Sequence, residues 1–221
     1  MLPTGSARLA ATLLAAVLGL AACGQGQPGS AAVVEDRRIG VLELQESTRE
    51  LLDARAARQP DASEEPADEA TAQLGVLTQL VRSELLEEAA ERNGVQVSEG
   101  QVDELLRQFE QQAGGREALE QDLVASGVPP SRLREIVRFI ANQNALGERL
   151  AAQAGGAQQQ GQTALRDLLV ETARQAGVEV NPRYGTWDAE QLEVVGSPSG
   201  GLATPVTSAA PVPAPAPAPA R

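Results

Sequence analysis

Apolar side chains recur at three- and four-residue steps through the middle of this 221-residue chain, and this spacing constrains the fold more than any other feature. In the stretch LGVLTQLVRSELLEEAAERNG they fall at positions 74, 77, 81, 85 and 89, with Leu80 and Leu86 widening the stripe. An α-helix brings residues at these steps onto one face, whereas a strand would require strict alternation. The spacing therefore predicts a long amphipathic helix that ends near Gly94.

The segments that follow repeat this pattern between recognisable helix start and stop signals. Ser98 followed by Gln101 is typical of a capping box, and Gly114 is a natural end for the helix that starts there. Three further helices are expected over residues 117–125, 131–150 and 163–175. The Gly/Gln-rich residues 155–162 are expected to break the chain between the last two.

Two short strand candidates flank the helices. One is AAVVED at residues 31–36, after which the chain should turn helical near Val41, and the other is VEVNPRYGTW at residues 178–187. Each is too short to be stable alone, so we expect them to pair and to join the two ends of the domain. The predicted fold class is mainly α with a minimal two-strand β element. It forms one domain over residues 31–192, which is long enough to bury about two-thirds of its chain surface.

The N-terminal 22 residues are typical of a targeting segment, with an apolar run from Leu9 to Leu20 too short to span a bilayer. The sequence LAAC at residues 20–23 resembles the lipobox of bacterial lipoproteins, which implies lipidation of Cys23 and a tether over residues 23–30. A thiolate is the nucleophile that thioether formation requires. The alternative is an ordinary signal segment in which the cysteine is accidental.

The C-terminal residues 193–221 are expected to form a disordered tail, because they are rich in proline, alanine and glycine. The repeat APVPAPAPAPA favours an extended polyproline II conformation. A solvated tail with no binding role is the preferred interpretation, and a spacer that reaches through a cell wall is the alternative. Residues 59–70, QPDASEEPADEA, are expected to be a solvated loop.

Composition excludes several kinds of chemistry. The single cysteine allows no disulfide framework, and the absence of histidine removes the usual catalytic triads and most zinc sites. A net charge of −12 disfavours nucleic acid as a partner. Adjacent carboxylates such as Glu87 and Glu88 do not share a helix face, and neither they nor Glu64 and Glu65 make a plausible acid/base dyad. We expect no enzyme activity, no cofactor, no metal site and no small-molecule substrate.

The few aromatic residues are expected to be structural. Phe109 and Phe139 fall on apolar helix faces and should be core residues. Tyr184 and Trp187 lie just past the second strand candidate, where both could pack back onto the helices. Contact with a bound peptide is the alternative for this pair.

The order of these segments resembles the N-terminal domain of SurA/PrsA-type extracytoplasmic folding factors. The resemblance rests on AAVVEDRRIGVLELQ, on VEVNPRYGTWD and above all on the helical stretch from LTQLVRSELL to NALGERL. It implies a helical domain that holds unfolded or translocating polypeptides. Enzymatic members carry a parvulin isomerase domain before the last helix, but only twelve residues separate Leu150 from Thr163 here, so the resemblance implies no isomerase activity.

The expected function is therefore that of a lipid-anchored chaperone-like protein on the extracytoplasmic side of the cell membrane. Its partners would be unfolded or newly exported polypeptides, and the membrane itself through a diacylglyceryl thioether and an N-acyl chain on Cys23. The alternative is a non-catalytic scaffold of the cell envelope that binds one specific protein.

Overall fold

The computed structural model of the chain describes residues 29–58 and 68–196, and these contain six helices, one 3-10 turn and five short strands. The helices are α1 (Val41–Arg58), α2 (Glu69–Arg92), α3 (Glu99–Ala113), α4 (Arg116–Ala125), α5 (Leu133–Gln153) and α6 (Gln158–Ala176), with the turn η1 (Pro130–Arg132) before α5. The strands are β1 (Ser30–Val34), β2 (Arg37–Gly40), β3 (Glu179–Val180), β4 (Thr186–Asp188) and β5 (Glu193–Val195). The prediction of a mainly α fold is confirmed.

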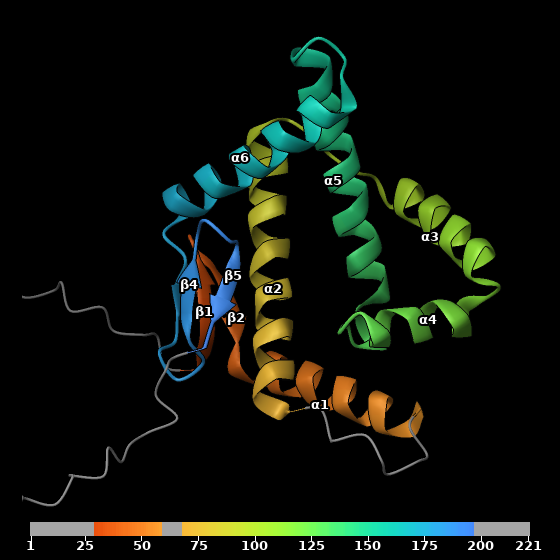
Figure 1. The fold of residues 1–221 in the computed structure, drawn as a ribbon, viewed down its shortest axis with the longest axis vertical. Coiled ribbons are helices and arrows are strands. Elements are labelled where there is room, and N and C mark those ends of the chain that lie inside the picture. Colours follow the sequence, from red (N-terminus) through yellow and green to blue (C-terminus); the bar gives the residue numbers. More distant parts are fainter. Residues whose placement is uncertain (1–28, 59–67, 197–221) are drawn as a thin grey trace, which may run out of the picture.

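Helix α2 is the central element of the molecule. Figure 1 shows it upright between the strands on one side and α5 on the other, with α6 crossing near one end and α1 near the other. The apolar stripe predicted from the sequence is buried, and Leu77, Val81 and Leu85 are 1% exposed or less. This burial holds the sheet and α1 in one core, which also includes Leu44 and Leu51 of α1.

The two strand candidates pair as predicted, but the β structure is larger than two strands. β1 pairs antiparallel with β3, which aligns Ala32 with Val180, and also with β2, which aligns Val34 with Arg37. A second sheet is formed by β4 and β5. The pairing of β1 with β2 was missed because β2 is only four residues long and begins with Arg37 and Arg38, so it has no apolar pattern of its own.

Strand β5 corrects the predicted start of the tail at residue 193. Val194 is only 6% exposed, and its backbone N–H donates a hydrogen bond of 2.9 Å to Thr78 Oγ1 on α2. Arg82, one turn further along α2, donates from Nε to the Leu192 carbonyl. The fold therefore continues through Val195, and the rest of the tail from residue 197 lies outside the described residues, as do residues 1–28 and 59–67.

Helix α6 begins at Gln158, five residues before the predicted start at Thr163. Gly161 was interpreted as part of a break, but it lies inside the helix where α6 crosses α5. A Cβ at Gly161 would lie 2.6 Å from the Gly147 carbonyl oxygen and 2.7 Å from Ala151 Cβ. The glycine thus permits close helix packing, and only residues 154–157 separate α5 from α6.

Helices α3 and α4 and the start of α5 form a separate part of the molecule that we call the lobe (residues 99–143). Figure 1 shows α3 and α4 on the far side of α5 from the sheet. Ser98 makes the predicted capping box with Gln101, and Gly114 ends α3 at a positive φ of 89°. The lobe is closed against α1 by Arg58 Nη1, which donates to the Gln121 carbonyl in the middle of α4.

Candidate functional site

A hollow of about 350 Å³ lies between β1 and the segment that carries the second strand candidate. Its floor is formed by Ala32 and Val33 of β1 and by Val180 of β3. Its other walls include Pro182, in the turn after β3, and Trp187 of β4. The lining is mainly apolar, so the hollow suits a short apolar stretch of polypeptide better than a charged ligand.

The turn between β3 and β4 is fixed by backbone contacts. The Asn181 carbonyl accepts a hydrogen bond of 2.8 Å from the Tyr184 N–H, and Asn181 Nδ2 donates to the Ser30 carbonyl on β1. Gly185 follows with φ of 142°, and a Cβ there would lie 2.4 Å from the Val195 carbonyl oxygen. Only glycine allows β4 to approach β5 so closely, and this approach positions Trp187.

Tyr184 and Trp187 differ in their surroundings. Tyr184 is 7% exposed within the main core, as expected for a structural residue. Trp187 is half-buried and packs on the same core, but it also lines the hollow. Its indole Nε1 is buried without a hydrogen-bond partner, which is unusual because buried N–H groups are nearly always paired. Trp187 therefore packs on the core, lines the hollow and carries a buried N–H donor without a partner.

The lobe has a small core. Three of its residues are fully buried: Val102 of α3 with Leu133 and Val137 of α5. Six half-buried apolar side chains pack against them, namely Val97, Leu105, Leu106, Phe109, Leu119 and Leu123. Partly buried apolar side chains gathered around so small a core leave some apolar area at the surface, which a partner could cover.

Two isoleucines of α5 extend this surface. On a helix turning 100° per residue, Ile136 and Ile140 lie between the face of Val137, which belongs to the lobe core, and that of Leu146, which packs against α2 and α6. Both isoleucines are half-buried, and they are outside the three clusters of packed apolar residues found in residues 29–58 and 68–196. Together with the six lobe side chains they form what we call the apolar lobe surface.

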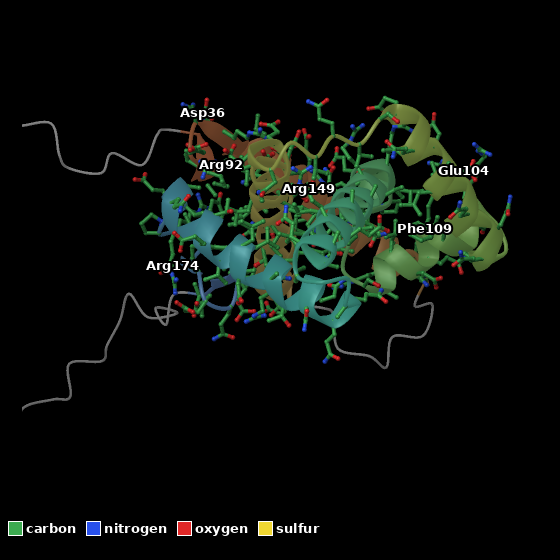
Figure 2. All side chains as sticks on the ribbon, turned by 90° about the horizontal axis from the view of Figure 1, so that it is seen from above. Asp36, Arg92, Glu104, Phe109, Arg149 and Arg174 are labelled. Atoms are coloured by element: carbon green, nitrogen blue, oxygen red, sulfur yellow. The ribbon has the colours of Figure 1, made fainter. Side chains whose placement is uncertain are left out.

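Phe109 and Phe139, expected in the core, are both half-buried. Phe139 packs against the cluster between α2, α5 and α6, whereas Phe109 belongs to the apolar lobe surface. Figure 2 places Phe109 and Glu104 at the end of the molecule formed by α3 and α4, opposite Arg92 and Arg174. Phe109 is thus a core residue only of the lobe.

The carboxylate pair Glu87–Glu88 belongs to an ionic cluster that the sequence did not reveal. Arg37 of β2 lies 3.2 Å from Glu87 and 2.9 Å from Glu91, and it also pairs with Glu84 and Glu88. Burial lowers the pKa of the Arg37 guanidinium, but its hydrogen bonds to Glu91 and Glu84 raise it more. The four glutamates recur at steps of three and four residues along α2, and this spacing could have indicated that they share one basic partner. The cluster attaches β2 to α2.

A second ionic cluster connects α3 to α5 within the lobe. Arg134 donates to Glu99 and Asp103, and Arg138 donates to the other oxygen of Glu99. These hydrogen bonds lower the pKa of the Glu99 carboxyl, which therefore stays ionised at a lower pH than usual. The pairs are exposed and serve to align the two helices.

Cys23 and the pair Glu64–Glu65 lie outside the described residues. Across residues 29–58 and 68–196, no group of three or more potential metal-ligating side chains is arranged to hold an ion. No helix in that part of the chain is long and apolar enough to cross a bilayer.

Comparison with known protein families gives one match. A family model described as the SurA-like N-terminal domain matches residues 7–139, which covers well over half of the chain. The match includes β1, β2 and α1 to α4 and ends within α5. No curated protein and no solved structure matches the chain.

Proposed function

The chain belongs to the SurA-like N-terminal domain family, and from this premise we propose that it holds unfolded or newly exported polypeptides without catalysing a reaction on them. A chaperone-like protein needs a surface that can bind polypeptides of many different sequences. Apolar contacts make this possible, because they require no fixed polar partner in the client. Binding would be weak and reversible, because each contact buries only part of one side chain.

The observation that carries this proposal is the apolar lobe surface. Seven of its eight side chains project from three helices around a core of three buried residues, and the eighth, Val97, lies in the loop just before α3. A surface of this kind stabilises the lobe only in part, so additional burial against a client adds favourable free energy. Arg134, Arg138 and Glu99 form exposed ion pairs elsewhere on the lobe, and such surface charge helps to keep a complex soluble.

The test is suppression of aggregation for several unrelated unfolded proteins. We expect the variant Ile136→Gln with Ile140→Gln to hold clients more weakly, by about fivefold for each isoleucine whose burial contributes on the order of 1 kcal/mol. Leu42→Gln is the matched control, because Leu42 is 72% exposed on α1, outside the lobe. Suppression of aggregation for only one particular client would refute the proposal in favour of a scaffold for one partner. An equal loss of suppression in the isoleucine variant and in Leu42→Gln would also refute it.

We also propose that the chain lacks prolyl isomerase activity. The four residues between α5 and α6, where enzymatic relatives of this type carry their isomerase domain, support this. An isomerisation assay on a prolyl peptide should give the buffer rate. A rate that rises with the concentration of purified protein would overturn the proposal.

Anchoring through Cys23 is a separate proposal. It rests on the LAAC sequence after an apolar run, and it places the protein at the extracytoplasmic face of the cell membrane. One lipid chain gives only marginal binding, so a diacylglyceryl thioether with an added N-acyl chain is the modification that would anchor stably. Mass spectrometry of the membrane fraction should find the lipidated Cys23 as the first residue, and an unmodified Cys23 would contradict the proposal.

A further inference from the structure

The hollow beside Trp187 is not required by the proposed function, since the apolar lobe surface lies on the other side of α2 and α5 (Figure 1). Its volume of about 350 Å³ is at the lower end of the range of ~300–1,000 Å³ typical of ligand pockets, so it admits a short piece of chain rather than a folded partner. Ala32 and Val180, which are paired across β1 and β3, both line it, so the hollow lies along strand backbone and favours an extended occupant.

The orphan donor of Trp187 defines what that occupant should supply. A buried N–H with no partner costs about 1–3 kcal/mol, and an acceptor brought to it recovers part of that cost. Nε1 is itself buried, so the half-buried indole has to turn toward the occupant to make this bond. A matching occupant would be rich in carbonyl acceptors, would have small apolar side chains and would have few N–H donors that themselves need acceptors.

A proline- and alanine-rich segment has these properties. Proline has no N–H, so every second residue of an Ala-Pro repeat offers a carbonyl without needing an acceptor. Such segments are already extended as polyproline II, which lowers the entropic cost of binding, and they dock in aromatic-lined grooves. Residues 210–220 of this chain have the sequence APVPAPAPAPA.

The position of this segment in the chain favours binding within one molecule. β5 pairs with β4 so that Val194 faces Trp187 and Val195 faces Thr186, a residue that lines the hollow. The chain therefore leaves the fold at Gly196, beside the hollow. A flexible connection of about 15 residues would span roughly 20 Å, which is enough for residues 210–220 to reach the hollow. Such a connection gives an effective concentration of about 1 mM or more.

The charge of residues 197–221 also favours their binding to this hollow. The whole chain has a net charge of −12, yet residues 197–221 contain no Asp or Glu, and their one charged side chain is Arg221. Glu179 lines the hollow and is exposed. The segment is therefore not repelled by the acidic body, and a nearby arginine would be attracted to this rim.

We propose that the hollow formed by β1, β3 and Trp187 is a binding site for proline- and alanine-rich polypeptide, and that a few consecutive residues of the segment 210–220 of the same chain occupy it. The tail would then serve as an intramolecular ligand that covers the apolar sheet surface. This differs from the solvated tail without a binding role that composition alone favours.

The test uses Trp187 as the reporter, because it is the only tryptophan in the chain and its indole N–H gives one identifiable NMR signal. The full-length protein is compared with a variant in which the five alternating prolines are replaced by serine. The substitutions are Pro211→Ser, Pro213→Ser, Pro215→Ser, Pro217→Ser and Pro219→Ser. In the matched control, Pro198 and Pro205, which lie outside the repeat, are replaced by serine instead.

We expect the indole N–H of the full-length protein and of the control to exchange with water roughly fivefold more slowly than in the five-serine variant, as one hydrogen bond of ordinary strength predicts. A peptide with the sequence of residues 207–221, added to that variant, should restore the signal saturably. The remaining amide signals should agree between the forms, which shows that the fold is intact.

Three results would overturn the proposal. Identical indole signals in the full-length protein and the five-serine variant would show that the tail does not occupy the hollow. A response only to the added peptide would show a proline-rich site whose occupant is another protein. A difference that disappears on tenfold dilution would show that a second copy supplies the tail. No client is present, so failure of the proposed chaperone function would leave this result unaffected.

Discussion

Gly161 shows how a residue that indicates a helix break in the sequence can instead be needed for close packing between two helices. Glycine lowers helix propensity, so the Gly/Gln-rich stretch was interpreted as a break. In the structure the same glycine allows α6 to approach α5, because a side chain would meet the Gly147 carbonyl and Ala151. Periodicity within one helix cannot reveal a requirement that comes from its neighbour.

Replacement of this glycine should therefore destabilise the protein. We expect Gly161→Ala to lower the free energy of unfolding by about 1–3 kcal/mol, the usual cost of overpacking. Gly75→Ala is the control, since Gly75 is exposed on α2 with nothing within 4 Å of the added Cβ. It should raise the free energy of unfolding by about 0.5–1 kcal/mol through helix propensity. Urea denaturation measures both, and equal effects of the two substitutions would contradict the close crossing.

At the scale of elements, the sequence predicted those parts of the fold that local chemistry determines. The capping box at Ser98 and the end of α3 at Gly114 were recognised because each signal lies within a few residues. The strands β2, β4 and β5 were missed because they are four residues or fewer, which is too short for an alternating apolar pattern to identify a strand. The apolar lobe surface could not be predicted either, since spacing identifies an apolar face but not what covers it.

The contact between α3 and α5 should depend on pH. Hydrogen bonds from Arg134 and Arg138 lower the pKa of Glu99 below its usual value of 4.5, so the folded state favours the ionised carboxyl. The stability it contributes is fully present above the unfolded pKa and is lost as the pH falls through the lowered folded value.

We therefore expect the free energy of unfolding to fall less steeply below pH 4.5 in Glu99→Gln than in the unmodified protein. Glu117→Gln, an exposed substitution on α4, serves as the control and should leave the slope unchanged. Urea denaturation across this range measures the slopes. Parallel curves for Glu99→Gln and the unmodified protein would show that the ionic cluster contributes nothing to the folded lobe.

At the scale of the whole molecule, the sheet and the lobe lie on opposite sides of α2 and α5 (Figure 1). β1 is the first element and β5 the last, and both pack against α2. A lipid anchor before β1 and a tail after β5 would therefore both connect at the sheet. The proposed client surface would then lie on the far side of α2 and α5 from these attachment points.

The most direct test of this account is methyl NMR of the full-length protein with an excess of a permanently unfolded client. Binding at the apolar lobe surface should shift the methyl signals of Leu105, Leu119, Ile136 and Ile140, while those of Leu77, which is fully buried in α2, stay in place. Shifts confined to residues outside the lobe, or no shifts at saturating client, would contradict the account.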